Sequence, residues 1–323
     1  MYSWLRQRVI KTEMRPRVAA DLAASGTGGL LVPELFSPGV AAALPVLFAA
    51  TRGPRVALFH DAIALKFPEL SPQKTVARFP AYLQELLAFD GIAAVSEDSA
   101  ITLQEYWQWL GLRDTPPLQT IPLGLHIEES QRPTEASPPS DPPTVLSVGS
   151  LEGRKNHLAL LEACERLWTD GLSFQLHLIG LAQTETGRAA LERIRVLQKA
   201  GRPLRYDGPV RETRLVQAYD QCSFTVYPSL MEGFGLPVLE SLAYGKPCIC
   251  SNRGALGEAT MGGGCIALAS TDATSLATAI QAVLEAPEKL AQLSLEARAR
   301  RLRPWSDYVA DLSNWMQQLP RRP

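Results

Sequence analysis

The stretch MEGFGLPVLE, residues 231–240, joins a glycine-containing turn to a carboxylate at each end. It follows FTVYPS (224–229), which predicts a buried strand, and leads into an apolar segment that predicts a helix. Gly233 and Gly235 permit positive φ and the close approach of a ligand to the backbone. Pro237 suits the first position of a helix. The stretch therefore predicts a turn whose free N–H groups bind a phosphate or diphosphate at the positive end of a helix.

The two glutamates of this stretch have different interpretations. Glu240 falls in the first turn of the predicted helix, where an acidic side chain interacts favourably with the helix dipole even without a ligand. Glu232 precedes the turn and does not cap the helix, so helix stability does not explain it. A diphosphate would repel the Glu232 carboxylate unless that carboxylate accepts hydrogen bonds, for which sugar hydroxyls are suitable donors.

Around this stretch, short apolar runs alternate with longer segments of helical periodicity. After the first 143 residues we expect strands at 144–149, 174–180, 204–208, 224–229 and 246–251, and helices at 157–168, up to about 198, 212–219 and 237–244. Apolar strands joined by crossover helices form parallel sheets covered on both faces, so this half predicts a doubly wound α/β domain. The first half shows the same pattern less completely, with strands expected at 55–61, 91–96 and 119–124, helices at 73–89 and 99–110, and Ser96 or Asp98 as a helix cap.

The length of 323 residues exceeds the size at which one hydrophobic core usually keeps growing, so we expect two domains. EESQRPTEASPPSDPP, 128–143, is rich in proline and serine and nearly free of apolar residues, which is typical of a linker. The expected division is a first domain over 1–127, a second over 144–303 and a terminal helix over 304–323. Two such domains leave a cleft between the carboxyl ends of their sheets, where open α/β folds bind ligands.

The composition, 46% hydrophobic and 20% charged residues, is typical of a soluble globular protein. A net charge of −1 provides no field that would recruit nucleic acid. The longest apolar run, VAAALPVLFAA (40–50), is too short for a transmembrane helix. The five cysteines are odd in number and scattered, which favours small core residues in the reducing cytosol over metal ligands.

Residues 1–17 carry several basic side chains against the single Glu13, interleaved with apolar residues. One interpretation is a solvated helix whose apolar stripe packs on its own domain. The other is a basic amphipathic helix lying on an anionic membrane, a peripheral contact on its inner, cytoplasmic face.

Two further stretches place polar residues after predicted strands. VGSLEGRKNH (148–157) brings Arg154 and Lys155 to a strand–helix junction, where they could bind a phosphate, although such pairs are usually surface residues. In FHDAIALKFPE (59–69), His60 ends a strand with Asp61 beside it, a pair that can orient groups or accept protons but is also common in purely structural roles.

Taken together, these stretches resemble the family-4 retaining glycosyltransferases of the GT-B fold. PSLMEGFGLPVLESLAYGKPCICSN is similar to the family's E-x7-E signature, VGSLEGRKNHLALLEA to its donor-phosphate motif in the RKN form, and HDAIALKFPE and AVSEDSA to its first-domain markers. The resemblance covers roughly residues 30–320 and is densest over 144–258. It implies two Rossmann-like domains facing a cleft, with the donor held mainly by the second and the acceptor facing the first. It also implies that the terminal helix crosses back to the first domain.

The resemblance implies a role for each matching position. Glu232 would bind hydroxyls of the donor sugar, and Glu240 those of the ribose. The diphosphate would lie against Arg154, Lys155, Gly233, Phe234, Gly235 and Leu236, and the nucleobase near the loop Gly208–Val210. His60 would face the reacting centre, where Lys155 and Glu232 complete the catalytic set. No metal or prosthetic group is expected, because fixed cations and a helix end stabilise the departing diphosphate.

The implied function is transfer of a hexose from a nucleotide diphosphate sugar to a glycan or lipid-linked acceptor, with retention of configuration. Mannose from a GDP-linked donor is the first expectation, with a UDP-linked donor as the alternative. Family members begin with a strand and a glycine-rich loop, whereas SGTGGLLVPE (25–34) follows no convincing strand, so we expect a shortened first domain. Many relatives carry an arginine where Ser150 stands, a difference for which Arg154 is expected to compensate.

The short first domain leaves open a second hypothesis, a catalytically impaired partner subunit that binds the nucleotide sugar without transferring it. A third class, a GT-B epimerase or phosphorylase, is disfavoured because no pyridoxal-phosphate lysine motif is visible.

Overall fold

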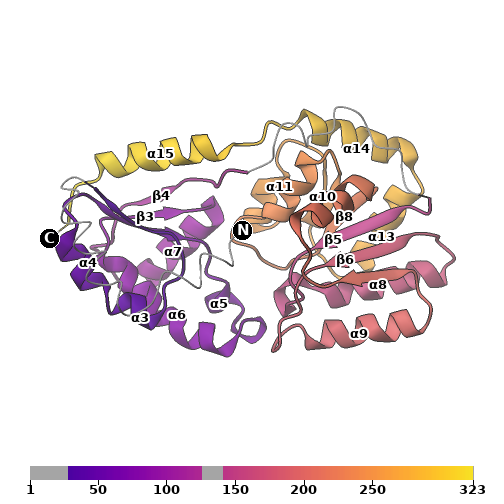
Figure 1. Ribbon diagram of the computed structural model, residues 1–323, viewed down its shortest axis with the longest axis horizontal. Helices are drawn as coiled ribbons and strands as arrows, with labels where there is room; N and C mark the ends of the chain where they lie inside the picture. Colours follow the sequence, from indigo (N-terminus) through magenta and orange to yellow (C-terminus); the bar gives the residue numbers. More distant parts are fainter. Residues whose placement is uncertain (1–27, 126–140, 323) are drawn as a thin grey trace.

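The computed structural model describes residues 28–125 and 141–322 of the chain. The basic N-terminal segment and most of the predicted linker lie outside the described residues. The described chain forms two α/β units, each built on a parallel sheet, which confirms the predicted fold class. Figure 1 shows the two units side by side, with the last helix running back over the first unit.

The first unit contains a four-stranded parallel sheet in the order β1-β2-β3-β4. Its strands are β1 (Leu30–Val32), β2 (Arg55–Phe59), β3 (Gly91–Ala94) and β4 (Leu118–Thr120). Its helices are α3 (Pro38–Ala41), α4 (Leu44–Ala50), α5 (Ile63–Lys66), α6 (Gln73–Glu85) and α7 (Glu97–Trp109), with short 3-10 turns η2 (Pro68–Leu70) and η3 (Leu86–Ala88). β1 is absent from the predicted strands, because three residues at a sheet edge are too few to show a periodicity. Ser96 caps α7 through a hydrogen bond from the Ser99 N–H, 3.1 Å.

The second unit contains a six-stranded parallel sheet in the order β10-β9-β8-β5-β6-β7. Its strands are β5 (Thr144–Val148), β6 (Gln175–Ile179), β7 (Leu204–Asp207), β8 (Phe224–Tyr227), β9 (Cys248–Ser251) and β10 (Cys265–Leu268). Its helices are α8 (His157–Thr169), α9 (Arg188–Lys199), α10 (Glu212–Gln221), α11 (Leu236–Ala243), α12 (Gly254–Thr260), α13 (Ala273–Leu284) and α14 (Pro287–Ala299), preceded by the 3-10 turn η5 (Gly153–Lys155). The chain reverses its direction of travel across the sheet between β5 and β8, which creates the switch point where doubly wound folds bind ligands.

The strands of the sheets are the most deeply buried segments of the chain. Every residue of β2, β3, β8 and β9 is buried. Because helices remove both faces of each sheet from water, these strands are mostly apolar along their whole length rather than alternating. Cys248 and Cys250 belong to this buried core, and all five cysteines are unpaired.

The helix α15 (Trp305–Gln318) follows the second unit in sequence but packs on the first. Tyr308 and Leu312 lie in one buried cluster with side chains of β2 and β3. Gly91 in β3 has no side chain because a Cβ there would come within 2.8 Å of Trp315. Beyond the helix, the backbone N–H of Arg322 donates to the buried Asp90 carboxylate at 2.6 Å. The end of the described chain is therefore anchored in the first unit.

The two units also meet directly. In α12 of the second unit, Glu258 accepts the backbone N–H groups of Glu97 at 3.0 Å and Asp98 at 2.8 Å. These groups lie at the start of α7, where a helix leaves N–H groups unpaired and favours negative charge. A single side chain thus stabilises the contact between the units by capping a helix of the other one.

No helix within residues 28–125 and 141–322 is long and apolar enough to cross a membrane.

We expect Leu312→Ala to reduce the free energy of unfolding by about 2–5 kcal/mol, because it leaves a cavity between α15 and the first sheet. Leu312 is 5% exposed, whereas Val309 on the same helix is 59% exposed. Val309→Ala is therefore the matched control and should change the stability only slightly. Urea unfolding measures the free energy of unfolding of both variants. Equal effects of the two variants would contradict a stabilising role for the packing of α15 on the first sheet.

Candidate functional site

Two loops meet at the switch point of the second sheet. One follows β5 and contains Arg154 and Lys155 in the turn η5, and the other follows β8 and contains Glu232. Carboxyl ends of parallel strands lie at the same edge of a sheet, so the two loops are brought together by the sheet rather than by the sequence. The backbone N–H of Leu230 donates to the carbonyl of Arg154 at 2.9 Å and fixes one loop on the other.

Glu232 forms ion pairs with both cations. Its Oε1 lies 2.7 Å from Nη1 of Arg154 and 2.7 Å from Nζ of Lys155, and the residue is only 9% exposed. Burial alone would raise the pKa of Glu232, but Lys155 and Arg154 outweigh that effect and hold it below its ordinary value. The site thus contains a carboxylate that stays ionised despite being removed from water.

The two cations differ in their surroundings. Arg154 also contacts Glu152, at 3.1 Å, so two carboxylates share its charge. Lys155 donates to the hydroxyl of Tyr227, and its Nζ lies 4.7 Å from the centre of that ring. Burial lowers the pKa of Lys155, an effect that Glu232 opposes. The sequence did not single out Tyr227, because it occupies an apolar strand and reads as a core residue.

The glycine turn leads into α11 at Leu236, one residue earlier than predicted, with Gly235 at φ 97° before it. Glu240 is therefore the fifth residue of α11, and the prediction that it lies in the first turn is wrong. The helix dipole does not explain a carboxylate at this position, because its effect is confined to the first turn. Glu240 instead accepts a hydrogen bond from the Tyr219 hydroxyl at 3.1 Å, and burial raises its pKa.

The loop Gly208–Val210 adjoins the buried cluster whose Tyr219 contacts Glu240. Val210 packs against a buried cluster that includes Tyr219 and Tyr244, whose rings stack at 4.8 Å. Tyr219 thus links the loop after β7 to the second glutamate of the sequence signature. The turn residue Phe234 packs in the other direction, against the cluster formed by α15 and the first sheet.

The first unit contributes the loop after β2. His60 Nε2 lies 2.7 Å from the carbonyl oxygen of Pro33. The carbonyl of His60 accepts a hydrogen bond of 2.8 Å from the Ser99 hydroxyl, which also contacts the Gly233 carbonyl at 3.3 Å. A Cβ at Gly233 would stand 2.2 Å from the His60 carbonyl oxygen. Glycine is required here by the contact between the units, a role that the sequence could not indicate.

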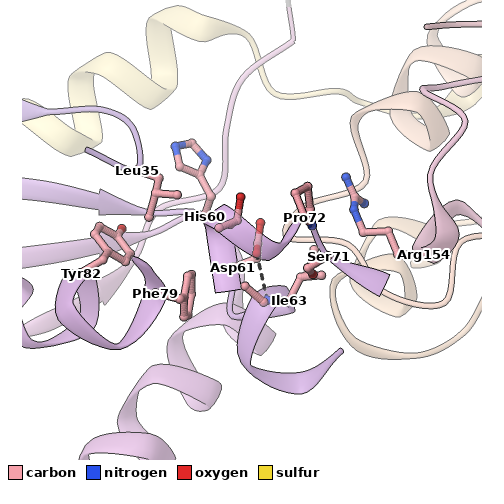
Figure 2. Close-up of a pocket in the computed structure, with 11 residues that line it drawn as sticks. Leu35, His60, Asp61, Ile63, Ser71, Pro72, Phe79, Tyr82 and Arg154 are labelled. Carbon is pink, nitrogen blue, oxygen red and sulfur yellow. Dashed lines mark hydrogen bonds between the residues drawn. The ribbon is translucent and has the colours of Figure 1, made fainter. Parts of the chain in front are cut away.

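Asp61, next to His60, is a further member of the site. Its Oδ1 accepts the Ile63 backbone N–H at 2.9 Å, and burial raises the pKa of its carboxyl group although Arg154 lies close enough to oppose the shift. Figure 2 shows Asp61 between His60 and Arg154 in this view. Among the described residues, no group of three or more His, Cys, Asp or Glu side chains is placed to hold a metal ion.

The chain matches a known family and is similar to curated proteins and solved structures. The family model described as glycosyl transferases group 1 matches residues 129–300. A serotype-specific mannosyltransferase, WbdA of Escherichia coli, is 26% identical over 204 residues, which cover 59% of this chain and 25% of the relative. A glycogen synthase of Mycobacterium tuberculosis is 34% identical over 173 residues, covering 53% of this chain and 40% of the relative. The chain thus spans about a quarter of the length of the mannosyltransferase.

Solved structures share the whole fold at low sequence identity. A sucrose-phosphate synthase from Thermosynechococcus elongatus aligns with a TM-score of 0.72 and 21% identity, over 95% of this chain and 78% of that structure. Anabaena HepE in complex with UDP-glucose aligns with a TM-score of 0.71 and 15% identity, over 95% of this chain and 82% of that structure. These similarities establish the GT-B fold.

We expect Glu232→Gln to reduce the free energy of unfolding by about 3–5 kcal/mol at neutral pH, because Arg154 and Lys155 lose the charge that neutralises them in a buried place. The folded pKa of Glu232 lies below its ordinary value of 4.5, so its ion pairs stabilise the fold above that pH. This stabilisation is lost as the pH falls through the folded pKa. The variant should therefore lose less stability on acidification than the wild type.

The measurement is the unfolding midpoint of both proteins between about pH 3 and 7. Glu162→Gln is the control, because the ion pair of Glu162 with Arg166 is solvent-exposed and should contribute little at any pH. Parallel curves for the wild type and Glu232→Gln would contradict the ion cluster as a stabilising element.

A second prediction concerns the contact between the units. Gly233→Ala should force the units apart, because the new Cβ would stand 2.2 Å from a backbone oxygen that cannot rotate away. Small-angle scattering should then show a larger radius of gyration. Gly208→Ala is the control, since a Cβ at Gly208 meets nothing within 4 Å. An unchanged radius in both variants would show that the close approach at Gly233 does not position the units.

Proposed function

Because the chain belongs to the group 1 glycosyl transferases, we propose that it transfers a hexose from a nucleotide diphosphate sugar to a glycan or lipid-linked acceptor. The observation that supports this most directly is the convergence of Arg154 and Lys155 on Glu232 at the switch point, beside a glycine turn and a helix N-terminus. Cations and free N–H groups suit a diphosphate, and an ionised carboxylate beside them suits sugar hydroxyls.

The proposed positions of the donor follow from this arrangement. The diphosphate lies against the turn formed by Gly233, Phe234, Gly235 and Leu236. Its oxygens replace Glu232 in some of the contacts that Arg154 and Lys155 make. Glu232 then accepts hydrogen bonds from the sugar, and Glu240, next to the loop Gly208–Val210, accepts them from the ribose. His60, at the other side of the boundary, faces the bond that breaks.

The proposed reaction retains the configuration of the sugar and needs no metal or prosthetic group. Negative charge develops on the departing diphosphate, and Lys155, Arg154 and the N-terminus of α11 are already oriented to stabilise it. The same groups hold the leaving phosphate beside the face of the sugar where the new bond forms. There an oxygen of this phosphate accepts the proton of the acceptor hydroxyl.

The donor proposed first is GDP-mannose, because curated relatives of the chain are named mannosyltransferases. A UDP-linked hexose is the alternative, because a structural neighbour holds UDP-glucose. We place the reaction in the cytoplasm, since the five cysteines are unpaired, and the basic residues 1–17 would supply a peripheral contact with a membrane.

A second candidate function is a partner subunit that binds the donor without transferring it. The first sheet has four described strands and the second has six. The smaller first sheet favours this candidate, because it provides less surface for binding an acceptor. It predicts donor binding without turnover until another chain is added.

The test is a panel of nucleotide sugars, including GDP-mannose and UDP-glucose, scored by thermal shift. A preferred donor at about 100 times its Kd should stabilise the fold by about 2.7 kcal/mol. With that donor, Glu232→Ala and Lys155→Ala should each reduce turnover by about 100-fold or more.

Glu162→Ala, at an exposed position of α8 outside both loops, is the control and should leave turnover unchanged. Absence of binding by every nucleotide sugar, or full turnover by Glu232→Ala, would refute the proposed function. Binding without turnover by the wild type would select the partner-subunit alternative.

A further inference from the structure

A cavity of about 180 Å³ lies at the boundary between the two units, beside the ion cluster. Figure 2 shows that most of its wall comes from the first unit, with His60 and Asp61 at one side and Arg154 of the second unit at the other. Pockets for drug-sized ligands measure roughly 300–1,000 Å³, so this cavity has room for a single small ring.

The wall combines an apolar surface with a polar edge. Phe79 and Ile63 supply the apolar part, and Asp61 and Thr75 supply oxygen atoms. A pyranose ring has the matching chemistry, because its C–H groups form apolar faces while its hydroxyls point outward as hydrogen-bond donors. Tyr82, also in the wall, is engaged elsewhere, since its hydroxyl donates to the Leu58 carbonyl at 3.4 Å.

Asp61 is the charged acceptor of the cavity. Among the described residues, its one hydrogen-bond donor is the Ile63 backbone N–H, at 2.9 Å to Oδ1. Its pKa is raised because burial outweighs the attraction of Arg154. A buried carboxylate with one hydrogen-bond donor is stabilised by a ligand whose hydroxyl donates a second hydrogen bond to it.

The charges around the cavity disfavour an anionic ligand. Among the described residues that line the cavity, Arg154 is the one lysine or arginine, and its guanidinium already contacts Glu232 at 2.7 Å and Glu152 at 3.1 Å. A phosphate or carboxylate group placed here would lie against the Asp61 carboxylate, and Arg154 is already shared by two glutamates and, in the proposed donor complex, by the diphosphate. The cavity is therefore suited to a neutral polyhydroxylated molecule.

We propose that this cavity binds one neutral sugar ring of the acceptor, with the Asp61 carboxylate accepting a hydrogen bond from a ring hydroxyl. The inference rests on the proposed function, which it deepens by naming the chemical class of the acceptor. The ring lies next to His60 and on the opposite side of the boundary from the diphosphate turn. An acceptor presenting only a phosphate at this place does not fit.

The test uses methyl α-D-mannopyranoside and methyl α-D-glucopyranoside as neutral probes and mannose 6-phosphate as the anionic counterpart, with binding measured by ligand-observed NMR on the full chain. We expect one of the neutral probes to bind at least ten times more tightly than the phosphorylated sugar. Asp61→Asn keeps the shape of the side chain and should weaken that binding about ten- to a hundred-fold.

A steric pair of variants separates the cavity from general effects on the fold. Thr75→Phe should fill the cavity and abolish binding of the neutral probe. Ala77→Phe places the same ring at an exposed position of the same helix and should leave binding unchanged. Equal binding by these two variants, or by Asp61→Asn and the wild type, would overturn the proposal, as would tighter binding of mannose 6-phosphate.

The last arm repeats the probe titration with the preferred nucleotide sugar present. Retained probe binding is expected if the ring belongs to the acceptor, and displacement of the probe would assign the cavity to the donor and overturn the inference. Failure of every nucleotide sugar in the thermal-shift panel would refute the proposed function alone, because the probe titrations report on the cavity without a donor.

Discussion

The carboxylate of Glu232 lies between two cations in a place from which water is almost excluded, and the geometry of the site depends on this arrangement. An isolated buried charge there would destabilise the fold, so the Glu232 carboxylate and the two cations Arg154 and Lys155 stabilise one another by neutralising their charges. The cluster fixes the loop after β8 on the loop after β5 at the point where the order of the strands reverses. A diphosphate bound here, as proposed, would meet cations that are already oriented. It would replace part of their ion pairing with Glu232, whose carboxylate could then accept hydrogen bonds from the sugar.

The glycine turn serves two neighbours at once. Gly235, at φ 97°, allows the chain to enter α11, whose N-terminus attracts an anion. Gly233 allows the backbone of the first unit to pass at His60, where any Cβ would collide with a carbonyl oxygen. The same few residues therefore shape the proposed donor site and position the surface on which the acceptor is proposed to lie. The cavity at Asp61 lies directly beyond this contact.

The relative position of the two units is held from several sides. The helix α15 packs on the first sheet through Tyr308 and Leu312, while Glu258 caps the start of α7 across the boundary. Each contact uses a different kind of interaction, apolar burial in one case and helix capping in the other. The cavity at Asp61 lies between the units that these contacts hold together.

The sequence by itself determined the α/β class, five of the six strands of the second unit to within two residues at either end, and the glycine turn before α11, whereas β10 was not predicted. It could do so because buried parallel strands and glycine turns leave local patterns in the chain. It could not reveal that Tyr219 contacts Glu240, or that Gly233 lies against His60, because these partners are far apart in the chain and have no shared periodicity. Only the tertiary structure decided those contacts, since the sheet edge and the docking of the two units bring the loops together.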